Sequence, residues 1–294
     1  MALLEPHERA LVKGYVINKF RGDQSLLTPG LDYLRERTGV PVAGVLPYFS
    51  DIHIPEEDSL GLESKLTDGG RASLDVAVTR LPHIANFDDF DPLMREPDVQ
   101  LRYVSSGGEF GHPDLVIIPG SKTTAADLDW LRAQGLAECI VAARRGGTPV
   151  VGICAGYQML GERLLDPGGV ESTRAETCGL GLLPLSTTFS NEKATHQVKA
   201  RVIEGRGLLS ACQGADLSAY EIHMGVTSAT GLTSPFLVNL RSGRSVEIRE
   251  GAADDEGLTI GTYLHGLFHS AAVRRSILGF VAERKGTYIQ TLTN

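Results

Sequence analysis

The chain has 294 residues, enough for about two domains with an ample core. Hydrophobic residues make up 42% of it and charged residues 22%, which is ordinary for a soluble globular protein and excludes a disordered, collagen-like or coiled-coil chain. The 36 acidic residues outnumber the 28 basic ones, so the net charge is −8 and sequence-independent binding to nucleic acid is not expected.

Cysteine usage and hydropathy indicate the compartment. Four cysteines are too sparse for a disulfide framework, and no pair has the C-x-x-C spacing of a zinc site. No run of about 18 apolar residues indicates a membrane span, and the first residues lack the apolar core of a signal peptide. We therefore expect a cytoplasmic protein with no bound metal and no membrane partner.

Strand and helix patterns alternate along the chain, which predicts an α/β protein. In the first part we expect a strand over 12–20, a helix over 26–37 and a strand over 40–46. A polar, turn-rich stretch without clear periodicity follows and indicates a boundary. We accordingly divide the chain into residues 1–65 and residues 73–290.

A second series of elements begins at Leu74. Its expected strands lie at 74–81, 99–104, 114–118, 148–153, 181–189, 196–203, 235–240, 244–249 and 257–264. Helices are expected over 123–145 with a break near Gly135, over 155–165 and over 271–284. The continuous apolar run at 148–153 is typical of the buried middle strand of a parallel sheet.

The segment Gly-Ile-Cys-Ala-Gly at 152–156 lies between an expected strand and an expected helix. It has the pattern of a nucleophile elbow with cysteine in the serine position. Side chains two residues before and after the nucleophile would collide at such a turn, which favours glycine at both positions. The helix N-terminus would favour a thiolate at Cys154, and the N–H of Ala155 would face an oxyanion beside the sulfur. The alternative is a buried core cysteine, the usual state of a free cysteine.

A cysteine nucleophile needs a base, usually a histidine far away in the sequence. His265 is the first candidate because it follows an apolar strand, at the strand end where sites in α/β proteins form. His223, in the segment YEIHMG, is its competitor. The other cysteines have no elbow, and we interpret Cys139, Cys178 and Cys212 as structural.

A third segment, IIPGSKTT at 117–124, runs from an apolar strand into a turn. Backbone amides at Gly120 or Ser121 could supply a second oxyanion donor. The alternative is an ordinary strand-to-helix turn with Ser121 or Thr123 as the helix cap. Lys122 does not make this turn a phosphate loop, because neither GxxxxGK[ST] nor GxGxxG occurs in the chain.

Together these segments resemble class I glutamine amidotransferases, in the branch that amidates corrin precursors. The order and spacing fit along nearly the whole chain, so the combination is much more specific than any one segment. The segments that carry the resemblance are VINKFRGD (16–23), LDYLRERTGVPVAGVLPY (31–48), IPEEDSL (54–60), IIPGSKTT (117–124), VVGICAGYQMLG (150–161), DPGGVES (166–172), GLGLLPL (179–185), YEIHMG (220–225) and GTYLHGLF (261–268).

The resemblance implies two domains. Residues 73–290 would form an open α/β sheet with flanking helices, and residues 1–65 the C-terminal remnant of an ATP-dependent domain similar to dethiobiotin synthetases. The ATP-binding start of that domain has no counterpart in this sequence, so a partner or a missing segment would supply it together with Mg-ATP. We expect no cofactor on this chain itself, and no complete amidation by this chain alone.

The resemblance also implies roles for single residues. Cys154 would be the nucleophile of a glutaminase and His265 its base. In many class I members a Glu two residues after the histidine orients it. Leu267 stands at that position here, and the corresponding residue in the resembling branch is also not Glu. Glu221 is only a guess for the orienting group. Val226 stands where family members commonly have Arg. The remaining oxyanion- or substrate-binding candidates are Ala155, which replaces a common Gly, and Gly120, Ser121 and Gln158.

The implied reaction takes ammonia from L-glutamine and passes it to the synthetase part. There ATP would activate carboxylates of adenosylcobyrinic acid a,c-diamide, and four amidations would give cobyric acid. Two alternatives remain open: a glutaminase subunit of another ligase, as in peptidoglycan amidation, and a non-catalytic fragment that only binds a partner.

Overall fold

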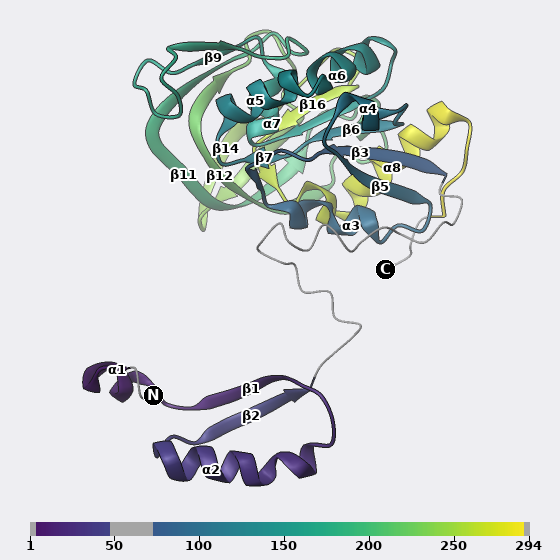
Figure 1. The fold of residues 1–294 in the computed structure, drawn as a ribbon. Helices are drawn as coiled ribbons and strands as arrows, with labels where there is room; N and C mark the ends of the chain where they lie inside the picture. The colour runs from purple at the N-terminus through teal and green to yellow at the C-terminus, as the bar shows by residue number, and fades with distance from the viewer. Residues whose placement is uncertain (1–3, 48–72, 291–294) are drawn as a thin grey trace. The chain divides into compact units, whose positions relative to one another are not determined.

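The computed structural model of the chain describes residues 4–47 and 73–290. The chain divides into two compact units, Met1–Pro55 and Glu56–Asn294 (Figure 1). The boundary that the sequence predicts between residues 65 and 73 lies outside the described residues.

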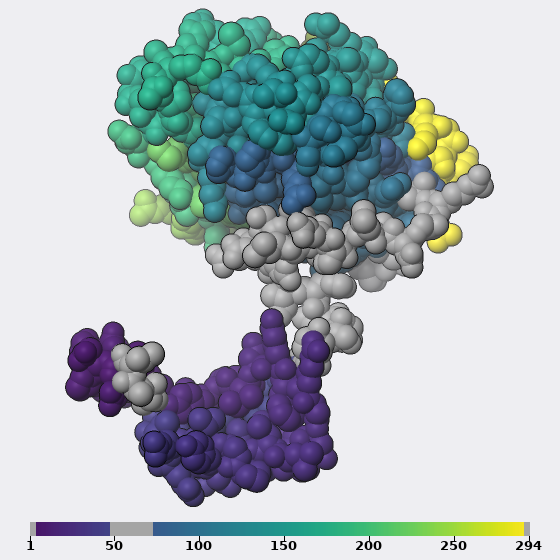
Figure 2. All heavy atoms as spheres, in the orientation of Figure 1, coloured from purple at the N-terminus to yellow at the C-terminus, as the bar shows by residue number. Residues whose placement is uncertain are grey.

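Unit 1, purple in Figures 1 and 2, is a small parallel pair of strands with one full helix. Its elements are α1 (Pro6–Leu11), β1 (Tyr15–Phe20), η1 (Gln24–Leu27), α2 (Thr28–Thr38) and β2 (Val42–Pro47). The three predicted elements are therefore confirmed, with later strand starts. Val40 is the only buried hydrophobic residue among the described residues of this unit. Two strands and one helix do not enclose a core of their own.

Unit 2 is built on a six-stranded sheet in the order β15-β16-β8-β6-β3-β5. Its strands are β3 (Leu74–Thr79), β5 (Val99–Val104), β6 (Leu115–Ile118), β8 (Val150–Ile153), β15 (Ala252–Ala253) and β16 (Thr259–Thr262). All pairs are parallel except β15 with β16. The first strand, β3, lies inside the sheet between the second and the third, and such a reversal of winding places ligands at the carboxyl ends of the strands.

Helices cover both faces of this sheet (Figure 1). The longer ones are α5 (Thr124–Ala133), α6 (Leu136–Arg145), α7 (Ala155–Leu160) and α8 (Ala271–Lys285), and the shorter ones are η3 (Phe87–Phe90), α3 (Asp91–Met94), α4 (Gly107–Phe110), η4 (Gly207–Leu209) and η5 (Leu267–His269). Successive side chains of a strand point to opposite faces. In β3, Val76 and Val78 pack in the cluster that includes α8, whereas Ala77 packs in the cluster with α5, α6 and α7. The strands are thus buried on both sides, as their continuous apolar sequences predict.

A second, seven-stranded sheet contains most of the later part of the chain. Its strands are β9 (Arg163–Leu165), β10 (Glu176–Cys178), β11 (Ser186–Val202), β12 (Asp216–Ser228), β13 (Phe236–Arg241), β14 (Arg244–Glu250) and β17 (Leu264–His265). A short ladder pairs β4 (Ile84–Ala85) with β7 (Gly120–Ser121). The predicted α/β class, an open sheet with flanking helices, is confirmed.

Between α7 and β12 the structure differs from the sequence-based expectations. The helix predicted over 155–165 ends at Leu160, because Gly161 is extended and a Cβ there would lie 2.4 Å from Leu185 Cδ1. The strands predicted at 181–189 and 196–203 overlap one continuous strand, β11, which begins only at Ser186 and ends at Val202. Strand β12 was not predicted: its sequence mixes polar residues with glycine, and its long pairing with β11 determines its conformation.

Candidate functional site

Cys154 lies on the sharp turn from β8 to α7, with φ 56° and ψ −111°. Such a backbone is strained for a residue with a side chain, and strain of this kind concentrates at functional sites. A Cβ on Gly152 would lie 2.7 Å from the backbone of Gly156, and one on Gly156 would lie 2.0 Å from the carbonyl oxygen of Ile118. The steric reason predicted for the two glycines is therefore confirmed.

Adjacent strands bring His265 to this turn. Strand β16 pairs in parallel with β8, so that Thr262 lies opposite Ile153 and the N–H of Cys154 donates to the carbonyl of Thr262 at 2.8 Å. His265 follows three residues later, where the chain passes into β17 of the second sheet. Gly120 lies beside both groups, because a Cβ there would be 3.2 Å from His265 Cε1 and 3.6 Å from Cys154 Cβ.

The carboxylate beside His265 belongs to Asp89, in η3. Its Oδ2 lies 2.7 Å from His265 Nδ1, and its Oδ1 accepts the N–H of Gly266 at 2.6 Å. Both side chains are buried. One oxygen of this carboxylate therefore holds the imidazole at Nδ1 and the other holds the adjacent backbone, which leaves Nε2 for the site.

Glu221, the orienting group guessed from the sequence, does not occupy this position. Tyr220 of β12 pairs with His265 and stacks on its ring at a centroid distance of 4.9 Å. Glu221 is the next residue of the strand, so its side chain points to the opposite face. There it forms an ion pair with Arg241 at 2.8 Å.

Sequence reasoning also missed Asn86, which lies just before η3 in a left-handed conformation with φ 54°. Its Nδ2 is 3.4 Å from His265 Nε2. The available signal was the segment 84–92, in which Asn86 and three aspartates follow a short strand. Nothing in that pattern distinguishes Asp89 from Asp88 or Asp91.

The two candidate histidines have opposite electrostatic environments. Burial alone would lower the pKa of His265. The interactions with Asp89 and Cys154 have the larger effect, and they raise this pKa from 6.5 to about 10. Burial lowers the pKa of His223 to about 4, so that its ring is neutral where it stacks on Tyr263 at 3.7 Å. Of the two, only His265 is positively charged at neutral pH.

A hollow of about 340 Å³ lies next to the sulfur. Its wall includes Cys154, Ala155, Ser121 and Gln158, together with His223. The Gln158 side chain is buried and already bonded: Nε2 donates to Met224 O at 2.9 Å, and Oε1 accepts the Thr124 hydroxyl at 3.0 Å. Gln158 thus ties α7 to β12 and to α5 at the edge of the hollow.

Two backbone N–H groups of residues that line the hollow are candidates for binding an oxyanion. Ala155 is the first residue of α7, and the first N–H groups of a helix have no acceptor within the helix. In the next segment the N–H of Lys122 donates to His83 O at 3.0 Å. Successive N–H groups of an extended strand point in opposite directions, so the N–H of Ser121 points away from that ladder. By the same alternation, the N–H of Gly120 points toward the ladder.

The Ser121 turn is fixed by a buried carboxylate. The Ser121 hydroxyl donates to Asp127 Oδ2 at 2.6 Å, and His83 Nδ1 lies 2.8 Å from Asp127 Oδ1. Ser121 Oγ in turn accepts the N–H of Thr123 at 2.9 Å. The helix-cap alternative was wrong for both residues: the N–H that Ser121 accepts precedes α5, and Thr123, the N-cap residue, makes no side-chain cap hydrogen bond.

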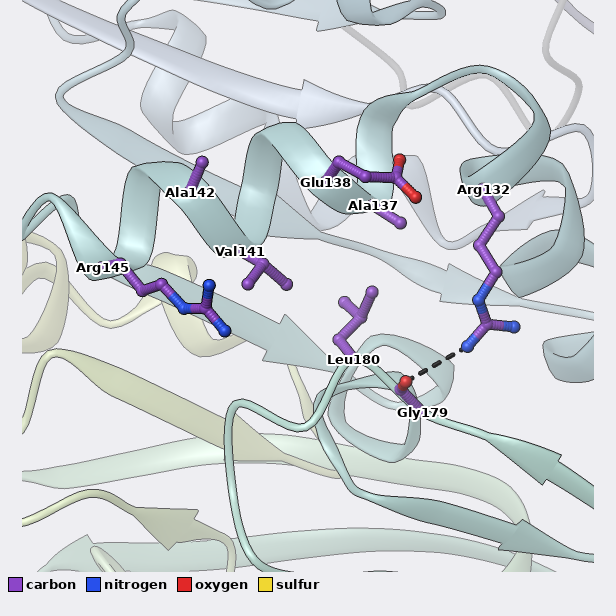
Figure 3. A pocket seen from close by; sticks show the side chains of 8 residues that line it. All are labelled: Arg132, Ala137, Glu138, Val141, Ala142, Arg145, Gly179 and Leu180. Carbon is purple, nitrogen blue, oxygen red and sulfur yellow. Dashed lines mark hydrogen bonds between the residues drawn. The ribbon is translucent and has the colours of Figure 1, made fainter.

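The other cysteines lie away from this hollow. Cys139 is half-buried on α6, Cys178 is exposed at the end of β10, and Cys212 is buried and donates to the carbonyl of Leu209. All four cysteines are free. A second hollow, of about 320 Å³, lies between α6 and the turn at Gly179, where Arg132 donates to the Gly179 carbonyl at 3.1 Å (Figure 3). It contains no cysteine or histidine.

Within residues 4–47 and 73–290, no group of three or more His, Cys, Asp or Glu side chains could hold a metal ion. No helix in the same described ranges is long and apolar enough to cross a membrane.

An open α/β sheet with a cysteine elbow beside a buried His–Asp pair defines a class I glutamine amidotransferase domain. The family model of the CobB/CobQ-like glutamine amidotransferase domain matches residues 75–273, and the chain belongs to this family. The class that the sequence predicts is thereby confirmed.

Among its relatives, the cobyric acid synthase of Desulfitobacterium hafniense is 48% identical over 97% of this chain and 56% of that protein. The cobyric acid synthase of Dehalococcoides mccartyi is 46% identical with the same coverages. The chain spans about half the length of these curated relatives. The solved structure of PurLQS from Thermotoga maritima matches with a TM-score of 0.54 and 18% identity, over 71% of this chain and 99% of that one, which supports the fold.

Proposed function

We propose that this chain hydrolyses glutamine and supplies ammonia for the amidation of a corrin carboxylate, as part of a cobyric acid synthase. The observation that carries the proposal is the strained elbow of Cys154 next to His265, whose Nδ1 is held by buried Asp89. The names of the relatives favour corrin amidation over the peptidoglycan-type alternative. The four free cysteines fit a reducing compartment such as the cytoplasm.

In the proposed first step the sulfur of Cys154 attacks the side-chain amide carbon of glutamine. The carbonyl oxygen becomes an oxyanion, which the N–H groups of Ala155 and Ser121 bind. One donor of this kind contributes roughly 3–4 kcal/mol to the stabilisation of the transition state. In this scheme Cys154 attacks as a thiolate and His265 starts as an imidazolium, which is the state of the imidazole that its raised pKa of about 10 favours.

His265 then gives its Nε2 proton to the amide nitrogen, the C–N bond breaks, and ammonia leaves a thioester on Cys154. In the second half, the neutral imidazole takes a proton from water while the water oxygen attacks the thioester. The C–S bond breaks, glutamate leaves, and the protonated imidazole faces a thiolate again. Asp89 holds the ring in one orientation through both halves.

The synthetase half would come from polypeptide that completes unit 1. Val16, Leu26 and Tyr33 are exposed there, with Leu11 and Leu46, and parallel sheets normally bury both faces. Among the described residues, no group of three or more His, Cys, Asp or Glu side chains could hold a metal ion, and neither GxxxxGK[ST] nor GxGxxG occurs. We therefore derive no step through ATP on this chain, and propose that Mg-ATP and the corrin carboxylate, from adenosylcobyrinic acid a,c-diamide, bind to the completing polypeptide.

Covalent labelling with 6-diazo-5-oxo-L-norleucine, a diazo-ketone analogue of glutamine, tests the glutaminase part. Intact mass and peptide mapping should show one adduct on Cys154, suppressed by excess glutamine. The Cys154→Ala variant should not be labelled, whereas the Cys139→Ala variant should be labelled as the wild type is. Labelling of several cysteines, or no labelling, would favour the non-catalytic fragment.

A further inference from the structure

We propose that Tyr220 stabilises the charged form of His265 by stacking on the imidazole ring, and that it is a positioning residue of the reaction. This inference rests on the proposed glutaminase mechanism, in which His265 starts as an imidazolium. Three observations carry it: the strand register that brings the two rings together, the geometry of the stack, and the burial of the charge.

The strand register places Tyr220 on the imidazole. Tyr220 of β12 lies opposite His265 of β17 in an antiparallel pair, and the pairing continues at Glu221 and Leu264. Side chains of residues directly opposite each other stand on the same face of a sheet, with their Cβ atoms about 5 Å apart. Backbone hydrogen bonds between the strands therefore fix the contact between the two rings.

The two rings are stacked rather than edge to face. Their centroids are 4.9 Å apart and their planes differ by 13°. The edges of the imidazole belong to other groups, since Asp89 lies at Nδ1 and Asn86 is 3.4 Å from Nε2. Tyr220 covers a face instead. A cation over an aromatic ring, within about 6 Å of its centroid, is attracted by the negative charge density of the ring face, and a protonated His265 meets this condition.

The charge on His265 has no access to water, because the side chain is fully buried. A buried charge needs partners within the protein. The ionisable groups around the two rings are Asp89, Asp88, Cys154 and His223. Of these, Asp89 and Cys154 raise the pKa of His265. The face of Tyr220 adds an attraction that requires no further negative charge in the site.

A second stack of histidine on tyrosine shows the uncharged case. His223, also on β12, stacks on Tyr263 with a centroid distance of 3.7 Å and an interplanar angle of 14°. Burial lowers the pKa of His223 to about 4, so this imidazole is neutral and is not attracted as a cation. Stacking alone therefore does not charge a buried imidazole, and at His265 the carboxylate of Asp89 is needed as well. His223 serves as an internal reference in the test.

The test measures the pKa of His265 by NMR of protein with ¹⁵N-labelled histidine, in which the variant His265→Gln identifies the signal. Tyr220→Leu removes the ring but keeps an apolar side chain, and should lower the pKa of His265 by about one. Tyr220→Phe is the matched control, since it keeps the ring, and should leave this pKa within about 0.3 of the wild-type value. The pKa of His223 should be unchanged in both variants.

A third variant separates charge from packing. With 4-cyanophenylalanine in place of Tyr220 the ring keeps a similar shape, but the cyano group withdraws electron density from its face. The pKa of His265 should then fall toward its value in Tyr220→Leu. A pKa as high as in Tyr220→Phe would mean that the ring only packs, and would overturn the inference. An unchanged pKa in Tyr220→Leu would overturn it as well.

Labelling of Cys154 by 6-diazo-5-oxo-L-norleucine connects this pKa to the reaction. The reagent takes up a proton at its diazo carbon, the sulfur attacks that carbon and dinitrogen leaves, so labelling needs the imidazolium. Relative to the wild type, Tyr220→Leu should therefore slow labelling about threefold more at pH 9.5 than at pH 7.5.

An equal slowing at both pH values would indicate a purely structural role for Tyr220 and would overturn the inference. A wild-type chain that the reagent does not label would instead refute the glutaminase function. The NMR measurement would still decide, in that case, whether Tyr220 stabilises the imidazolium.

Discussion

Replacing Asp89 by Asn is the sharpest test of the proposed catalytic arrangement, because it changes charge with little change in size. Asp89 contributes a hydrogen bond to His265 Nδ1 and another to the Gly266 N–H. The amide of Asn would present an N–H to one of these donors. We expect the imidazole to lose its fixed orientation and most of its proton affinity.

The pKa of His265 measures the size of the effect. It is raised from 6.5 to about 10, which corresponds to roughly 5 kcal/mol in favour of the imidazolium, shared between Asp89 and Cys154. Without the carboxylate, only Cys154 of these two would oppose the effect of burial, so the pKa of His265 should fall. In Ser-His-Asp triads the same substitution lowers kcat about 10⁴-fold. For Asp89→Asn we expect glutamine hydrolysis to be slower by about 10² to 10⁴-fold.

The assay is the rate of Cys154 labelling, or of ammonia release where turnover is measurable, between pH 5 and pH 10. The wild-type rate should change little near neutral pH, whereas the variant should gain a pH dependence there. Asp88→Asn is the matched control, since Asp88 is the adjacent carboxylate and does not contact His265. A rate for Asp89→Asn within about threefold of the wild type would refute the reasoning.

Three further predictions concern stability. Gly156→Ala would place a methyl group against Ile118 O and should lower the free energy of unfolding by about 3 kcal/mol or more. The control is Gly279→Ala, in α8, where the methyl group would meet open space and should be neutral or stabilising. Denaturant unfolding measures both. Asp127→Ala removes the acceptor for the Ser121 hydroxyl and should cost about 2 kcal/mol; an unchanged midpoint would contradict that role. The pKa of His265 is raised in the folded state, so its contribution to stability is complete below pH 6.5 and should be lost as the pH rises toward about 10. Unfolding midpoints measured across this range test the prediction, and their dependence on pH should be weaker in Asp89→Asn.

The parts of the site that sequence predicts well are those determined locally. The elbow needs only neighbouring residues, and both glycines follow from contacts within one strand–turn–helix unit. The break between α5 and α6 near Gly135 has the same origin, since Gly135 takes a left-handed conformation with φ 71°. Such features depend on backbone sterics that the residue types themselves reveal.

The orienting carboxylate could not be predicted in this way. Asp89 and His265 are 176 residues apart in sequence, and they meet because η3 packs beside η5. Excluding Glu221 requires the register of β12 against β17, since a shift of one residue exchanges the two faces of a strand. Because β12 itself was not predicted from the sequence, that register was out of reach.

The nucleophile and the base belong to different sheets. Cys154 ends a strand of the six-stranded sheet, whereas His265 lies in β17, which pairs with β12 of the seven-stranded sheet. The distance between sulfur and imidazole is therefore a property of how two separately hydrogen-bonded layers pack. The two sheets are joined at this point by the chain itself, since β16 ends at Thr262 and β17 begins at Leu264. A displacement of the seven-stranded sheet would therefore reach the imidazole through this short connection.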